Sequence, residues 1–191
     1  MELATLQELY LHHLKDVYSA EKQITRALPK MIRAATNPEL AAALREHLQV
    51  TERQIERLDR IFTGLGKSPR SSKKCKGMEG LLEEGAELLA EEDADPEVLD
   101  AGLIAAAQKV EHYEISAYGT LRAYAELLGE SEAAGLFDTT AQEEGDADKT
   151  LTGIATRAVN LSALSPEGAE PRPRRKPARR GGRKGGLTKK K

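Results

Sequence analysis

The sequence contains few of the residues that stabilise β-sheets, disulfide frameworks or membrane spans. Trp is absent and aromatic residues make up only 4% of the 191 residues, which argues against a sheet protein. Cys75 is the single cysteine, so a disulfide framework and a zinc site built from several thiolates are both excluded. No apolar run approaches the roughly 18 residues of a membrane span, and polar residues interrupt the first segment on every turn. We therefore expect a soluble cytoplasmic protein with neither a membrane segment nor a secretory signal.

Charged residues are distributed unevenly along the chain. Residues 171–191 hold 11 of the 29 basic residues and no acidic residue, so the first 170 residues carry 18 basic residues against 31 acidic ones. The last segment also combines Pro and Gly with few apolar residues, and such a composition cannot form a packed core. We predict one domain over residues 1–163 and a disordered basic tail over residues 164–191.

Helical periodicity dominates the predicted domain, which is rich in Ala, Leu and Glu. Apolar side chains recur at alternating intervals of three and four residues in four long segments, and Pro or Gly residues separate these segments. We expect long helices over about 3–35, 38–63, 97–128 and 131–160, and a short helix over about 78–92. Two hairpins joined by a long connection are typical of one bundle class. The predicted fold is therefore all-α: a ferritin-like four-helix bundle with a crossover that contains the short helix.

Two carboxylates interrupt an apolar stripe on the third long helix. Glu111 and Glu114 lie in register with Ile104, Tyr118 and Leu121, on the face that should point into the core. An unpaired carboxylate in such a position costs several kcal/mol, so it is normally protonated, paired or bound to a metal. The other three long helices also carry polar residues on their apolar faces, and this recurrence is the main indication of function.

Counting residues from each turn places these polar side chains at one depth in the bundle. Glu21 and Gln54 lie at similar distances from the first turn, as do Glu114 and Glu144 from the second. If the crossover spans the bundle, all four helices contribute to one layer, within about one helical turn of 5.4 Å. The candidate metal ligands are Glu21, His47, Gln54, Glu111, Glu114, Glu144 and Asp148.

Buried carboxylates at one level repel one another unless a cation is present. Oxygen ligands with an imidazole suit iron, with manganese as an alternative, and two bridged ions are common in such bundles. The other interpretation is a protonated or water-filled polar network that only fixes the helix register. Tyr18 and Tyr118 lie near the same depth, either as redox neighbours of the metals or as core residues with satisfied hydroxyl groups.

The polar residues occur in stretches that resemble the YciE/YciF family of ferritin-like proteins. The matching stretches are Asp16–Gln23, Leu28–Met31, His47–Arg57, Ala105–Ile115 and Glu143–Asp148. The resemblance covers about residues 3–160, and the third-helix motif is its most specific part. It implies a rubrerythrin-like bundle that forms a homodimer, acts in stress responses and has a ferroxidase or di-metal activity. If the site works as an oxidase, Fe(II) is the reductant and O₂ or peroxide the oxidant. By analogy, Glu21, Glu111, Glu114 and Glu144 match the family's carboxylate ligands.

Two helices depart from the ferritin pattern because they lack its usual Glu-x-x-His pair. The second helix offers His47, Thr51 and Gln54 instead, and the fourth offers Glu144 and Asp148. With fewer strong ligands, mononuclear or partly occupied metal binding stays open beside a di-iron site. A nucleic-acid-associated or structural dimeric stress protein without catalysis stays open as an alternative function.

The basic tail predicts non-specific binding to the phosphate backbone of DNA or RNA, with a steep salt dependence. Aromatic residues are not interleaved with the basic ones, so base stacking is not indicated. Docking of the tail on the acidic bundle and a contribution to solubility are the alternatives. The candidate contact residues are Arg172, Arg174, Arg175, Lys176, Arg179, Arg180, Arg183, Lys184, Lys189, Lys190 and Lys191.

Overall fold

The computed structural model describes residues 4–69 and 74–164, and this part of the chain is helical without strands. The elements are α1 (Leu6–Ala34), α2 (Pro38–Gly64), α3 (Lys76–Ala90), α4 (Pro96–Leu127), α5 (Ser131–Ile154), the π-helical turn η1 (Ala155–Val159) and α6 (Asn160–Leu164). The predicted all-α fold is confirmed, with element boundaries close to those expected. Except for Leu164, the predicted basic tail lies outside the described residues.

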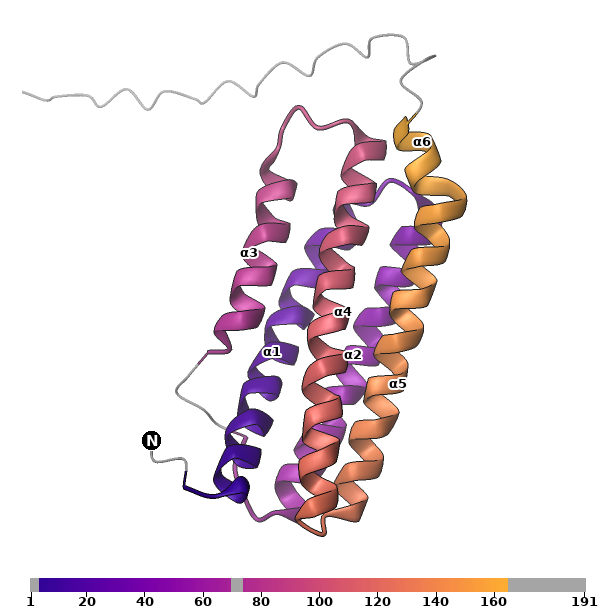
Figure 1. Cartoon of the computed structure of the whole chain (residues 1–191). Coiled ribbons are helices and arrows are strands. Elements are labelled where there is room, and N and C mark those ends of the chain that lie inside the picture. Colours follow the sequence, from indigo (N-terminus) through magenta and orange to yellow (C-terminus); the bar gives the residue numbers. More distant parts are fainter. Residues whose placement is uncertain (1–3, 70–73, 165–191) are drawn as a thin grey trace, which may run out of the picture.

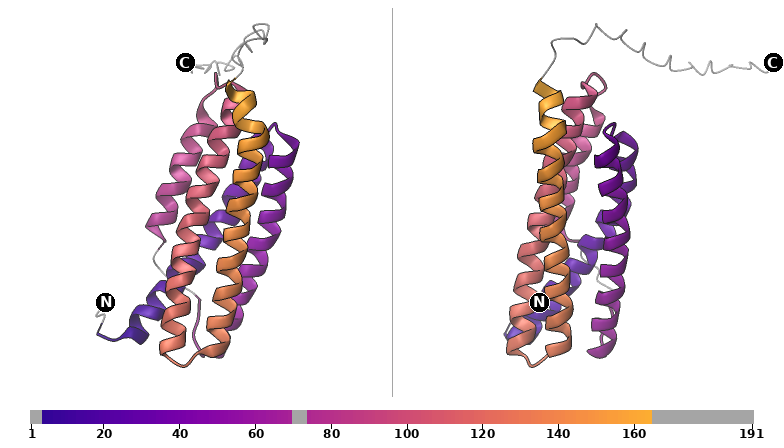
Figure 2. Two further views of the ribbon diagram at one scale, coloured as in Figure 1. Left: turned by 45° about the vertical axis from the view of Figure 1, so that its right-hand side comes forward. Right: turned by 90° about the vertical axis from the view of Figure 1, so that its right-hand side faces the viewer.

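Four long helices form the bundle, and the crossover helix α3 lies along its outside (Figure 1). Helix α1 packs against α2 and α4, and α5 packs against the same two helices, so α2 and α4 are diagonal neighbours. The views of Figure 2 show the α1–α2 hairpin beside the α4–α5 hairpin. Helices α2 and α4 both start at the upper end in Figure 1, which confirms that the crossover spans the bundle.

Local sequence explains where the long helices begin. Thr5 and Glu8 form a capping box at the start of α1, each side chain accepting a hydrogen bond from the other residue's backbone N–H. The side chains of Asn37 and Asp95 accept hydrogen bonds from the first backbone N–H groups of α2 and α4, and each precedes a Pro at the first helical position. Gly129, with φ of 79°, reverses the chain between α4 and α5.

One buried carboxylate ties the start of α4 to the turn between α1 and α2. Asp100 is 2% exposed and accepts hydrogen bonds from the Thr36 N–H at 2.9 Å, the Thr36 hydroxyl at 2.7 Å and the Asn37 N–H at 2.7 Å. Charge-assisted hydrogen bonds of this kind are stronger than neutral ones. The contact fixes the height of α4 relative to the first hairpin, and therefore the level at which its glutamates enter the core.

A polar layer divides the hydrophobic core into two clusters. The cluster nearer the α1–α2 turn includes Ile24, Leu44 and Leu151, and the other includes Leu14 and Phe137. The buried polar residues between them are Glu21, His47, Thr51, Gln54, Glu111, Glu114, Thr140 and Glu144. The predicted layer to which all four helices contribute is therefore present.

The predicted fourth helix over 131–160 is interrupted before its end. The turn Ala155–Val159 is π-helical, which adds one residue to a helical turn and rotates the chain that follows. Ala155 and Val159, at the two ends of this turn, are both buried. Among the described helices, none has the length and apolar character that a membrane crossing requires.

Candidate metal centre

Three glutamates and one histidine from three helices meet at the middle of the bundle. His47 lies on α2, Glu111 and Glu114 on α4, and Glu144 on α5. One potential ligand atom from each residue lies within 4.8 Å of the others. The His47 Nε2 atom is 3.5 Å from Glu111 Oε1 and 4.0 Å from Glu144 Oε2. These distances are longer than hydrogen bonds, but they would let one cation contact several ligands.

The cluster is buried, and many of its polar atoms have no hydrogen-bond partner. The side chains of His47, Glu111 and Glu144 are 9%, 3% and 0% exposed, respectively. The buried atoms without a partner in this layer are Glu21 Oε2, His47 Nε2, Gln54 Oε1, Glu111 Oε2, both carboxylate oxygens of Glu114, and Glu144 Oε2. Each such atom is costly to leave unpaired, so the layer is suited to a ligand that accepts several lone pairs.

Burial and mutual repulsion shift the pKa values of these groups away from their ordinary ranges. Burial raises the pKa of Glu21 to about 8, and the carboxylate of Glu144 contributes to the increase. Burial also raises the pKa values of Glu111 and Glu114 well above 4.5, again with a contribution from Glu144. It lowers the pKa of His47, although nearby carboxylates oppose that shift. Without a cation, Glu21, Glu111 and Glu114 therefore favour their protonated forms and the imidazole of His47 its neutral form.

A buried tyrosine holds the fourth carboxylate beside the cluster. The hydroxyl group of Tyr118 donates a hydrogen bond to Glu21 Oε1, and the ring is 1% exposed. This bond favours the ionised form of Glu21, but the effect of burial on the pKa is larger. The second oxygen of Glu21 remains without a partner. Tyr118 thus lies in direct contact with a candidate ligand and has a satisfied hydroxyl group.

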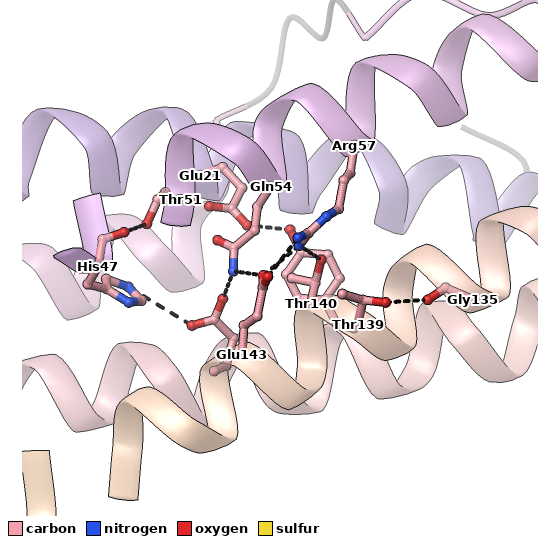
Figure 3. Close-up of polar contacts among 11 residues, drawn as sticks. Glu21, His47, Thr51, Gln54, Arg57, Gly135, Thr139, Thr140 and Glu143 are labelled. Atoms are coloured by element: carbon pink, nitrogen blue, oxygen red, sulfur yellow. Dashed lines mark hydrogen bonds and ion pairs between the residues drawn. The ribbon is translucent and has the colours of Figure 1, made fainter. Parts of the chain in front are cut away.

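Gln54 acts as a hydrogen-bond donor to two glutamates of α5 (Figure 3). Its Nε2 group donates to Glu144 Oε1 and, at 3.2 Å, to Glu143 Oε2. Arg57 binds Glu143 through two hydrogen bonds of 2.5 and 2.6 Å and also donates to Thr140 at 3.2 Å. In this arrangement Gln54 orients Glu144 through its Nε2 group. Only the Oε1 atom of Gln54 remains available as a ligand.

Other candidates lie beside the cluster or away from it. Asp148 accepts a hydrogen bond from Gln108 at 2.8 Å and lies 3.4 Å from the exposed His112, so the structure does not bring it into the cluster. Asp148 lies one turn beyond Glu144 on α5, but its side chain turns toward Gln108 of α4 instead of the core. Tyr18 packs on the ring of Phe62 and is only partly buried.

The supporting pair of Arg57 and Glu143 was not among the predicted site residues. Its signal was present in the sequence, because Arg57 follows Gln54 by one helical turn and Glu143 precedes Glu144. Register counting between α2 and α5 would have placed these four side chains together. The register of hairpin neighbours alone does not reveal this contact, because α2 and α5 belong to different hairpins.

The donor set fits a divalent transition metal. Carboxylate oxygens with one neutral imidazole suit iron or manganese, and the partnerless oxygens are the atoms that such an ion would engage. A cavity of about 230 Å³ between α2 and α5 is lined in part by His47 and Glu111, so it reaches the cluster from the surface. The carboxylates could therefore neutralise a cation that enters from solvent.

The fold and the buried layer define a ferritin-like four-helix bundle with a carboxylate–histidine cluster in its core. Residues 5–164 match the family model described as a domain of unknown function, DUF892. The chain is 47% identical over 163 residues to protein YciF of Escherichia coli (strain K12), covering 85% of this chain and 98% of that protein. The chain belongs to the YciE/YciF family, as the sequence motifs predicted.

Solved structures share the fold. The crystal structure of the Escherichia coli stress protein YciF matches with a TM-score of 0.79 and 46% identity, over 83% of this chain and 99% of that one. YcfI of Rhodopseudomonas palustris, for which a structural role has been suggested, matches with a TM-score of 0.76 and 48% identity, over 81% and 97% of the two chains. A Xanthomonas campestris protein that is 24% identical has the same fold, with a TM-score of 0.68 over 84% and 97%.

Proposed function

We propose that the protein binds iron in the buried cluster and oxidises Fe(II) with O₂ or peroxide, as part of a stress response. The observation that carries this proposal is the set of buried carboxylate oxygens of α1, α4 and α5 that lack hydrogen-bond partners, together with His47 Nε2 and Gln54 Oε1 of α2. The stress role follows from the Escherichia coli protein YciF, which is described as a stress protein. A di-iron site is the preferred form, with a single iron or manganese as the alternative.

The residues of the cluster would have different roles in metal binding. Glu111, Glu114, Glu144 and His47 would hold the metal, with Glu21 as a further carboxylate. Bound Fe(II) would supply the electrons that reduce the oxidant: two electrons from two Fe(II) ions and two protons from solvent convert one peroxide into two waters. The surrounding side chains, among them Tyr118 and Gln54, keep these groups in place.

A polar network that fixes only the helix register explains the layer less well. Such a network should satisfy its own hydrogen bonds, since a half-satisfied buried network destabilises the fold. In their ionised forms, both oxygens of Glu114 and one oxygen each of Glu21, Glu111 and Glu144 lack a partner, so the network is satisfied only where protonated glutamates pair, Glu21 with Glu114 and Glu111 with Glu144. A cation that binds these oxygens removes the cost of leaving them unpaired.

The rate of Fe(II) oxidation tests the proposal. Anaerobic protein loaded with Fe(II) is mixed with O₂ or with peroxide, and Fe(III) formation is followed by its absorbance. The wild type should oxidise Fe(II) faster than Glu111→Gln/Glu114→Gln. The matched control Glu87→Gln/Glu92→Gln removes two exposed carboxylates near the end of α3 and should match the wild type. Equal rates of Fe(II) oxidation in all three proteins would contradict the proposed oxidase activity.

We also propose that residues 171–191 contact DNA or RNA through their phosphates. Eleven basic residues without an acid in this segment support it, because such tails bind polyanions through counterion release. A gel shift at low salt should require the tail and weaken steeply as salt is added. Unchanged binding after removal of residues 171–191 would contradict the proposal, and tighter nucleic-acid binding by an isolated tail peptide would indicate docking on the acidic bundle.

A structural dimer without catalysis is the remaining alternative. The structural role suggested for YcfI of Rhodopseudomonas palustris favours it. Sedimentation of the purified protein measures the homodimer, and a dimer that neither retains nor takes up Fe(II) or Mn(II) would support this alternative over the iron oxidase.

A further inference from the structure

The cavity between α2 and α5 connects the protein surface to the cluster. Its volume is about 230 Å³, and its walls come from residues of α2 and α5 that include Ala43, Val50 and Ala147. His47 and Glu111 also line it. The cavity therefore has a mostly apolar wall and a polar end at the candidate metal centre.

Among the described residues, every charged residue that lines this cavity is acidic. Glu46, Glu111, Glu143 and Asp146 contribute carboxyl groups, and no Lys or Arg of the described ranges lines it. Glu46 and Asp146 are exposed, from α2 and α5 respectively, and so lie at the outer end. Asp146 forms an ion pair with Lys149 at 2.9 Å, but both side chains are more than 75% exposed, and such pairs hold their partners weakly.

The inner end of the cavity contains unpartnered, buried ligand atoms. The side chains of His47 and Glu111 are 9% and 3% exposed, and His47 Nε2 and Glu111 Oε2 have no hydrogen-bond partner. An acidic mouth alone would be an ordinary solvated surface. Joined to buried atoms of this kind, it forms a path from negative groups at the surface to unpartnered ligand atoms in the core.

We propose that this cavity is the route by which divalent cations enter the metal centre, with Glu46 and Asp146 as the residues that first attract them. The inference rests on the proposed metal centre and adds its point of entry. Carboxylates at the mouth of a cleft with apolar walls raise the local concentration of cations and their rate of association. His47 is then the first buried ligand that an entering ion meets.

A second cavity provides the contrast. It measures about 270 Å³, lies between α1 and α3, and its charged lining is mixed: Arg26, Lys30, Lys74, Glu79 and Glu83. Its floor consists of residues of one hydrophobic cluster, such as Met31 and Val110, with no residue of the proposed metal centre. Of these two cavities, only the one between α2 and α5 combines negative charge with access to the cluster.

The association rate of Co(II) with the full-length, metal-free protein tests the route without depending on oxidase activity. Glu46→Gln/Asp146→Asn removes the charge at the mouth and keeps the shape, and should slow association by about threefold or more at low ionic strength. The effect should shrink as salt is added. The control Glu87→Gln/Glu92→Gln removes the same amount of charge from a distant surface and should associate at the wild-type rate.

A steric variant provides the second test. Ala43→Leu/Ala147→Leu fills part of the cavity and should slow association further, whereas Ala123→Leu, at an exposed site of α4, should not. Wild-type association rates in both the charge and the steric variant would overturn the route while leaving the metal centre intact. Slower Fe(II) oxidation by the steric variant with normal Co(II) association would also overturn it, and would assign the cavity to the oxidant. Failure of the wild type to bind Co(II) would instead contradict the metal centre itself.

Discussion

The His47 Nε2 atom lies 3.5 Å from Glu111 Oε1, which joins α2 to its diagonal neighbour α4 across the centre of the bundle. Neither helix forms a hairpin with the other, so this approach depends on the crossover and on the Asp100 contact that sets the height of α4. A side chain from each hairpin thus reaches the same point. The candidate metal centre is a feature of the assembled bundle.

The metal-free protein should lose stability as pH rises from about 6.5 to 8. Glu21, Glu111 and Glu114 have raised pKa values, so the folded state holds protons that the unfolded state has already released. Their stabilising contribution is complete below the ordinary value of 4.5 and disappears as pH passes the folded values. The lowered pKa of His47 acts in the opposite sense, but above 6.5 that imidazole is neutral in both states.

Thermal unfolding of the chelator-treated protein at several pH values measures this effect. The triple variant Glu21→Gln/Glu111→Gln/Glu114→Gln serves as the control for all other titrating groups and should show a weaker decrease. An identical pH dependence in the wild type and the triple variant would show that these three glutamates do not cause the loss of stability.

Metal binding should release protons at neutral pH. A bound cation favours carboxylates, whereas burial keeps these groups protonated in its absence. Titration of metal-free protein with Mn(II) in a weakly buffered indicator solution should therefore acidify the solution, by more at pH 6.5 than at pH 9. Binding without proton release would mean that the glutamates are already ionised.

Arg57→Leu should lower the free energy of unfolding by about 1–3 kcal/mol, because the partly buried carboxylate of Glu143 loses its ion pair and keeps only the hydrogen bond from Gln54. Denaturant unfolding measures the change. The control Arg60→Leu breaks an ion pair with Glu132 in which both side chains are more than 65% exposed, and should cost about 0–1 kcal/mol. Equal costs for the two variants would show that the Arg57 pair has no special role.

Asp100→Ala should destabilise the protein by about 2–4 kcal/mol, since three hydrogen bonds at the α1–α2 turn lose their acceptor. Asp100→Asn retains an acceptor oxygen and should lose less. Denaturant unfolding compares the two, and the Ala variant should also bind Co(II) more weakly because the height of α4 is no longer fixed. If a destabilised variant binds Co(II) with wild-type affinity, the hydrogen bonds of Asp100 are not needed to position the metal centre.

The sequence was sufficient to predict the bundle and the polar layer because both depend on periodicity. Glu111 and Glu114 were recognisable as misplaced carboxylates, and short turns kept antiparallel neighbours in countable register. The side chains that support the layer were less accessible to this reasoning. Gln54 could be a ligand or a donor, and the choice depends on where Glu143 and Glu144 point once α5 is packed.

Contacts with residues distant in the sequence account for other features that the sequence did not predict. Asp148 shares a face with Glu144 but turns toward Gln108 on α4, a partner that intrahelical spacing does not reveal. Asp100 binds residues more than 60 positions away in the sequence. The π-helical turn Ala155–Val159 contains no Pro or Gly, so no local signal marks it. For Asp148 and Asp100, the decisive partner lies far away in the sequence.

Metal content tests the central claim most directly. Metal-free wild-type protein and Glu111→Gln/Glu114→Gln are incubated anaerobically with Fe(II), desalted, and analysed for bound iron per chain. We predict that the wild type retains at least one ion per chain and that the double variant, folded to the same helical content, retains far less. Equal retention by both proteins, or none by the wild type, would contradict a metal centre in the polar layer.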